Sequence, residues 1–107
     1  TMDLAAGTDT VNTNAAATVD GAGALTTNGV ALSNVETLAS TNGSLTNTAG
    51  DDTINLTGNE AGDTNGIGFT GINTLDAAGG SDTLNTNADT ELTGTAGEAL
   101  SNGVTVS

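Results

Sequence analysis

The chain has 107 residues and a formal charge of −13, which comes from 13 Asp and Glu residues with no Lys, Arg, His, Cys or Pro. Without His, Cys, Lys, Arg or Tyr it lacks the usual general bases, thiolates, amine nucleophiles and phosphate clamps, so we expect no enzymatic activity. A chain without basic residues cannot displace the counterions of a nucleic acid, and no apolar run approaches the ~20 residues of a membrane span. We therefore expect neither nucleic-acid binding nor membrane insertion.

The composition also limits the kind of fold. Val, Ile, Leu and Phe supply 20 of the 107 residues, whereas Thr, Ala, Gly and Asn supply 67. So small an aliphatic fraction cannot fill a large central core. We therefore expect short rows of aliphatic side chains, buried between layers of hydrogen-bonded backbone.

The first predicted element spans residues 7–12, with the sequence Gly-Thr-Asp-Thr-Val-Asn. The same pattern, G-x-D-T-(aliphatic)-N, returns at residues 50–55 and 80–85. Gly and Asp favour a turn, and Thr followed by an aliphatic residue favours a strand. Each copy therefore predicts a tight turn that leads into a short strand.

Asn-Gly pairs form the second recurring element, at residues 28–29, 42–43, 65–66 and 102–103. Both residue types tolerate the positive φ of a tight turn. Aliphatic or aromatic residues at alternate positions follow three of these pairs and one G-x-D-T element, and this period of two predicts half-buried strands. The alternating residues are Val30 and Leu32, Ile54 and Leu56, Ile67 and Phe69, and Val104 and Val106.

Three of the Asn-Gly pairs are spaced by 37 residues, beginning at Asn28, Asn65 and Asn102. This spacing indicates one domain, 1–107, made of a partial unit (1–28), two full units (29–65 and 66–102) and the start of another (103–107). We predict an all-β repeat protein, a β-solenoid with units of about 37 residues, and keep a β-sandwich array as the alternative. The Asn-Gly pairs are predicted to form its corners. The predicted core consists of Val30, Leu32, Val35, Leu38, Ile67, Phe69, Ile72 and Leu75.

The G-x-D-T-(aliphatic)-N elements resemble half of the glycine- and aspartate-rich nonapeptide of RTX-type calcium-binding β-rolls, most closely at residues 79–84. The segments 34–38 and 71–75 look like the V-E-T-L and I-x-T-L units of Thr-, Ala- and Asn-rich bacterial S-layer and adhesin proteins. This resemblance implies a secreted, repetitive protein of the bacterial surface.

Four aspartates are candidate calcium ligands: Asp9, Asp51, Asp52 and Asp82. They lie in glycine-rich turns, where backbone carbonyls could complete the set of oxygen ligands that Ca²⁺ prefers. Alternatively, an Asp before a Thr bonds its own backbone and shapes the turn. Calcium is the only cofactor that the sequence suggests, and both interpretations remain open.

We predict a structural subunit or segment of an extracellular bacterial filament, S-layer or biofilm matrix, whose partner is a copy of itself, added head to tail or laterally by strand stacking. A calcium-dependent adhesin that binds cell-surface glycans is the alternative, and a functional amyloid is a third. The chain begins without a signal-peptide pattern, and Thr1-Met2-Asp3 resembles Thr74-Leu75-Asp76. We therefore expect a processed product, either a window of a longer array or a subunit that stacks end to end.

Overall fold

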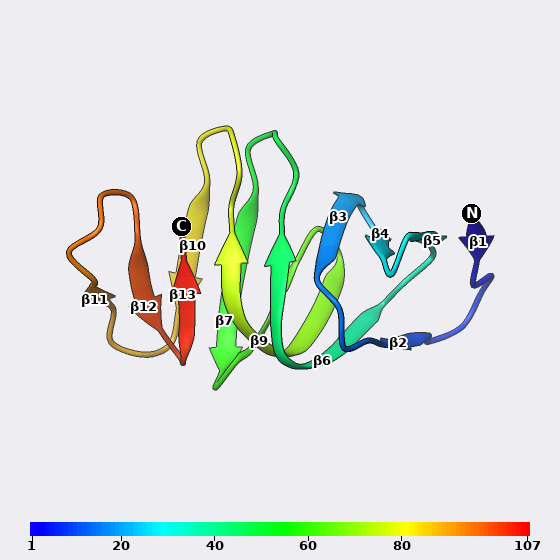
Figure 1. Cartoon of the computed structure of the whole chain (residues 1–107), viewed down its shortest axis with the longest axis horizontal. Helices are drawn as coiled ribbons and strands as arrows, with labels where there is room; N and C mark the ends of the chain where they lie inside the picture. The colour runs from blue at the N-terminus through cyan, green and yellow to red at the C-terminus, as the bar shows by residue number, and fades with distance from the viewer.

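The computed structural model describes all 107 residues as a β-solenoid of about four turns, with thirteen strands and no helix. It is elongated, with extents of 41 × 25 × 21 Å, and the first and last strands lie toward opposite ends of its long axis (Figure 1). The strands are β1 (Met2–Asp3), β2 (Thr10–Asn12), β3 (Ala17–Gly21), β4 (Ala24–Thr27), β5 (Val30–Ser33), β6 (Thr37–Thr46), β7 (Thr53–Gly58), β8 (Ala61–Thr64), β9 (Ile67–Asp76), β10 (Thr83–Thr86), β11 (Glu91–Leu92), β12 (Ala99–Ser101) and β13 (Val104–Val106).

The strands form two walls. The first wall has the order β1-β5-β4-β3-β6-β9-β13-β12-β11, and the second has the order β2-β6-β9-β8-β7-β10. The ten-residue strands β6 and β9 belong to both, because their first halves pair in the second wall and their second halves pair in the first. Nine strands spaced by about 4.8 Å span roughly 38 Å between the first and the last, which accounts for the long dimension of the molecule.

One circuit of the solenoid is shorter than the 37-residue unit. Partners in parallel strand pairs lie 27 to 31 positions apart in the sequence, from Thr10 beside Thr37 to Leu38 beside Phe69. The extra residues of each unit form an antiparallel three-stranded meander: β3-β4-β5, β7-β8-β9 and β11-β12-β13. Successive meanders lie in the first, the second and again the first wall. One 37-residue step therefore carries the chain to the opposite wall.

Backbone hydrogen bonds repeat with the same period. The Gly23 amide donates to the Asn65 carbonyl at 2.9 Å, and 37 residues later the Glu60 amide donates to the Asn102 carbonyl at 2.7 Å. Both donors have positive φ, 66° for Gly23 and 53° for Glu60. The sequence repeat is therefore also a repeat of geometry, in which one meander's first turn rests on the next meander's Asn-Gly turn.

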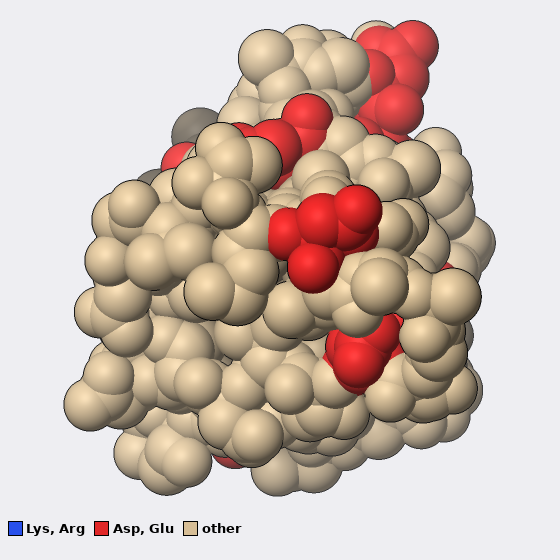
Figure 2. Space-filling view, turned by 90° about the vertical axis from the view of Figure 1, so that its right-hand side faces the viewer, with Lys and Arg blue, Asp and Glu red and all other residues tan.

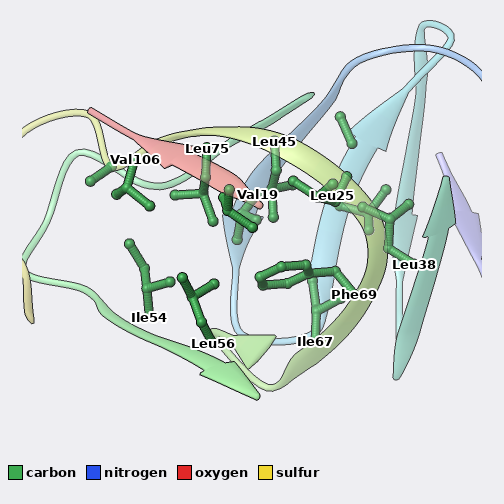
Figure 3. Packing of buried hydrophobic residues seen from close by; sticks show 14 of the residues in the cluster. Val19, Leu25, Leu38, Leu45, Ile54, Leu56, Ile67, Phe69, Leu75 and Val106 are labelled. Carbon is green, nitrogen blue, oxygen red and sulfur yellow. The ribbon is translucent and has the colours of Figure 1, made fainter. Parts of the chain in front are cut away.

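The core is a thin double row of side chains between the two walls. Figure 3 shows Leu45, Leu75 and Val106 pointing from the first wall toward Ile54 and Leu56 of the second. Sixteen apolar residues are buried in this single cluster. Short rows of this kind are what a chain so poor in aliphatic residues can fill, and the solenoid, not the sandwich array, is the architecture that forms them.

Seven of the eight predicted core residues are buried, and Val30 is the exception, with 39 % of its side chain exposed. Val30 lies on β5, the second strand from the N-terminal end of the first wall. Its equivalent 37 residues later, Ile67, is fully buried in the middle of the solenoid. The burial of this position thus depends on its place along the axis.

The Asn-Gly pairs at 28–29, 65–66 and 102–103 are not corners between the walls, as the sequence suggested. They are two-residue hairpin turns that reverse the chain between antiparallel strands. Asn and Gly both have positive φ in each turn, for example 51° at Asn65 and 76° at Gly66, the geometry that matches the twist of a hairpin. The chain turns between walls within β6 and β9 and in the loops that follow them.

Candidate functional site

Two copies of the G-x-D-T-(aliphatic)-N motif, residues 50–55 and 80–85, stack directly on each other. Strands β7 and β10 pair in parallel, so that Thr lies beside Thr, Ile beside Leu and Asn beside Asn. The turns before them are also joined, because the Asp52 amide donates to Asp82 Oδ1 at 2.9 Å and the Ser81 amide donates to Asp51 Oδ1 at 2.8 Å. The motif is therefore a self-complementary stacking unit.

A glycine makes this close contact between the turns possible. A Cβ atom at Gly80 would lie 2.5 Å from the carbonyl oxygen of Gly50, and Gly80 has φ of 107°. Only glycine combines that conformation with so close an approach of two backbones. The second glycine of the motif copy at 79–84 thus has a structural explanation.

Asp52 is the buried acidic group of this site, with 6 % of its surface exposed. Its carboxylate accepts hydrogen bonds from the Thr48 hydroxyl at 2.9 Å and from the Asn65 amide group at 2.9 Å. A buried carboxylate is tolerated when such donors replace water. Asp52 therefore ties the stacked turns to the hairpin turn at 65–66.

Asp9 lies away from the other three aspartates, near the N-terminal end. Its amide donates to Glu36 Oε2 at 2.8 Å and its carbonyl accepts from the Thr37 amide at 3.1 Å. This is the arrangement that Asp52 makes with Asp82 and Thr83. The Asp9 carboxylate itself accepts no hydrogen bond, and its Oδ2 is shielded from solvent without a partner.

The four predicted calcium ligands thus fall into two places, with Asp51, Asp52 and Asp82 at one and Asp9 at the other. No group of three or more acidic side chains is arranged to hold a metal ion. In the stacked turns, the carboxylates already accept hydrogen bonds from backbone amides, a hydroxyl and an amide side chain. The turn-shaping role of these residues is visible in the structure, and calcium binding stays a prediction.

Both ends of the solenoid present unpaired strand edges. Strands β1 and β2 each pair on one side only at the N-terminal end, and so do β10 and β11 at the C-terminal end. The most exposed large apolar side chains lie on these end strands, Met2 with 53 % and Leu92 with 87 % exposed. The sequence analysis predicted stacking at the ends but named neither Met2 nor Leu92, although the likeness of Met2 to the buried Leu75 was a signal for the first of them.

A groove of about 720 Å³ opens between the walls at the C-terminal end. Its apolar lining includes Ile54, Leu84, Leu92 and Val106, and its rim includes Asp82 and Glu98. Leu84 is packed against the core but only partly buried, as are Leu4 and Val11 at the other end. The groove is the exposed end of the core, bounded by the free edges of β10 and β11.

All charged side chains of this chain are acidic. Figure 2 views the N-terminal end and shows separate acidic groups in an otherwise uncharged surface, with no basic residue among them. On β1, the amide of Ala5 and the side chains of Asn34 and Ser33 hold the pKa of Asp3 below its ordinary value of 3.8. Asp3 therefore remains charged at neutral pH, and the end strand carries that charge beside Met2.

Comparison with protein-family models, with curated protein sequences and with solved structures finds no match to this chain. The structure contains no helix with the length and apolar character needed to cross a bilayer. The residues and geometry of the chain itself must therefore carry any functional argument.

Proposed function

We propose that this chain is a structural element of an extracellular bacterial assembly, such as a filament, S-layer or biofilm matrix, and that it assembles by stacking β-strands end to end. The observation that carries the proposal is the pair of open ends, where unpaired strand edges coincide with exposed apolar side chains of the core. Monomeric β-proteins avoid such edges, whereas a filament uses them.

The fold supports a mechanical role in two further ways. The backbone ladder runs through every strand, and the core is a continuous row without a large ligand cavity at its centre. The composition lacks His, Cys, Lys and Tyr, which are common general bases and activated nucleophiles near neutral pH. The chain is built to extend a regular lattice of backbone hydrogen bonds.

The placement outside the cell rests on the composition and on the resemblance to S-layer, adhesin and RTX-type repeats. Thirteen acidic charges without a basic partner repel one another, and the ions of an external medium screen that repulsion. Calcium at the acidic ends would strengthen the same effect.

Sedimentation velocity and negative-stain microscopy over a wide concentration range test the proposal. The samples should contain about 1 M NaCl, where the Debye length is roughly 3 Å, and should be compared with and without Ca²⁺ and EDTA. We expect species that grow with concentration, seen as fibres about as wide as one solenoid. A monomer under all of these conditions would refute the assembly role and favour the binding module.

A further inference from the structure

Resting on the proposed function, we propose the specific junction between copies: a second copy of this chain places its β1 on β10 and its β2 on β11, after a half-turn about the solenoid axis. The half-turn follows from the repeat. Each 37-residue step moves the meander to the opposite wall, and this chain contains three meanders. After an odd number of steps, the next unit begins on the wall opposite to the one where the chain began.

The strand order of the two ends fits this rotation. At the N-terminal end, the first wall has four strands beyond β6 (β3, β4, β5 and β1), whereas the second wall has one, β2. At the other end, β10 and β11 are each four strands from β6 in their own walls, and β11 lies farther along the long axis than β10 (Figure 1). A 37-residue step from the first wall to the second advances the chain by four strands along the axis, as from β3 to β7. A step from the second wall to the first advances it by one strand, as from β9 to β13. Three such steps bring β1 next to β10 and β2 next to β11.

Each proposed strand pair has a precedent inside the chain. The sequence Thr1-Met2-Asp3 resembles Thr74-Leu75-Asp76, the part of β9 that pairs in parallel with β6. Strand β1 would pair with β10 in the same way, so that Met2 lies against Leu84. Strand β2 carries the same motif as β10, which pairs in parallel with β7. The counterpart of β7 in the next meander is β11, so β2 of the second copy would pair in parallel with β11.

The exposed apolar residues complement each other in this arrangement. Leu92 occupies the place in its meander that Val19 occupies in the first one, since Leu92 pairs with Ala99 as Val19 pairs with Leu25. Val19 is 2 % exposed, whereas Leu92 is 87 % exposed because no strand follows β11. The groove beside Leu92 is therefore a part of the core that no further strand covers. The apolar residues of the N-terminal end that remain at least partly exposed would cover it, and these are Met2, Leu4, Val11 and Val30.

A polar group points to the same junction. Asp82 begins the β10 copy of the motif, and its carboxylate accepts the amide of Asp52 from the adjacent coil. Asp9 has the same place in the β2 copy, yet its carboxylate accepts nothing; Oδ2 is shielded within the chain, so Oδ1 is the acceptor that a second copy can reach. With β2 stacked on β11, the backbone amide that precedes β11, that of Thr90, would reach the Asp9 carboxylate as Asp52 reaches Asp82.

Charge opposes this docking, and the two-residue strands β1 and β11 offer few pairing groups. Natural edge strands are commonly blocked by Lys, Pro or bulges, and this chain has neither Lys nor Pro. Asp82 and Glu98 on the groove rim would face Asp3 and Asp9 of the second copy, so the junction requires screening by salt or divalent cations.

Cross-linking between separately prepared cysteine variants tests the junction, because the chain has no native cysteine. Met2→Cys and Leu84→Cys chains are mixed in about 1 M NaCl, where the Debye length is roughly 3 Å, and treated with a short thiol-reactive cross-linker. Val11→Cys with Leu92→Cys forms the second matched pair. Thr70→Cys is the control, since Thr70 is exposed and lies on β9, a strand in the middle of the solenoid that pairs on both sides. Circular dichroism checks that each variant keeps its strand content.

We expect dimers of Met2→Cys with Leu84→Cys and of Val11→Cys with Leu92→Cys, and no more than background dimer with Thr70→Cys. A dominant Met2–Leu92 product would indicate head-to-tail stacking without the half-turn, and a Leu92–Leu92 product would indicate tail-to-tail pairing; either overturns the junction. Assembly in sedimentation without either expected product overturns the junction and leaves the proposed function standing. Absence of assembly overturns both.

Discussion

At the scale of single residues, the three meanders fill the same inward-facing position with different pairs of side chains. The inward pair that faces across the hairpin is Leu25 with Leu32 in the first meander and Gly62 with Phe69 in the second. In the third it is a pair of small residues, Ala99 with Val106. The only aromatic side chain therefore lies opposite a glycine, and the thin core keeps its width.

This pairing predicts that Gly62→Ala destabilises the fold. A Cβ atom at this position would lie 2.0 Å from the carbonyl oxygen of Asn55 and 3.0 Å from Phe69 Cζ. Relieving such overpacking costs about 1–3 kcal/mol, which urea denaturation would detect as a lower midpoint. The matched control is Gly58→Ala, because nothing lies within 4 Å of a Cβ atom there. Equal midpoints for the two variants would contradict this account.

At the scale of elements, the Asn-Gly turns do more than reverse the chain. In the second meander, the Asn65 side chain donates to Asn47 Oδ1 at 2.8 Å and to Asp52 Oδ1 at 2.9 Å. Asn47 in turn donates to the hydroxyl of the buried Thr64, directly before the turn. The turn residue thus fastens the hairpin to the loop that follows β6, and each meander has a related contact.

Two substitutions separate the turn geometry from this network. Asn65→Gly keeps the positive φ but removes both hydrogen bonds, and we expect a loss of about 1–2 kcal/mol in the free energy of unfolding. Asn65→Ala removes the same bonds and also forces a residue with a Cβ into the left-handed region, which adds roughly 1–2 kcal/mol. Denaturant titration of both variants measures the difference. If Asn65→Ala were no less stable than Asn65→Gly, the turn conformation would not be a source of strain.

The sequence allowed most of the fold to be predicted, because its signals were local or periodic. Alternating aliphatic residues predicted strands, and the 37-residue spacing predicted a repeat, which the structure confirms as a solenoid. The role of the Asn-Gly pairs as hairpin turns was missed, because the same sequence pattern predicts a tight turn at a corner and in a hairpin. The coil of about 30 residues was hidden as well, because the antiparallel insert that lengthens each unit is visible only once strand partners are known.

The candidate site was harder to predict than the fold. The four aspartates were recognised as a group, but sequence spacing could not show that Asp9 would lie apart from the stacked turns. The end surface depends on which strand is last in each wall. Leu92 and Val19 look alike in the sequence as aliphatic strand residues, and only the order of the strands makes one exposed and the other buried.

At the scale of the whole molecule, charge and hydrogen bonding act in opposite directions. Of the 56 backbone hydrogen bonds, 43 belong to the strand ladders that hold the fold together, while 13 acidic groups without any basic side chain repel one another. Proteins stabilised by surface ion pairs lose stability when salt screens attraction. This chain has no such pairs to lose, so salt removes only repulsion between its side chains.

We therefore expect the thermal midpoint of the dilute monomer to rise between low salt and about 0.1 M NaCl, the range in which the Debye length falls to roughly 10 Å. Scanning calorimetry or circular dichroism at low protein concentration measures it. The double variant Asp89→Asn with Glu91→Gln removes two exposed charges that make no hydrogen bond in the chain, and it should start from a higher midpoint and respond less to salt. Because general effects of NaCl on water act on both proteins alike, the difference between their two slopes isolates the repulsion. A midpoint that falls with salt in the parent chain, or an equal slope in the variant, would mean that repulsion between coils is not what limits the stability of this solenoid.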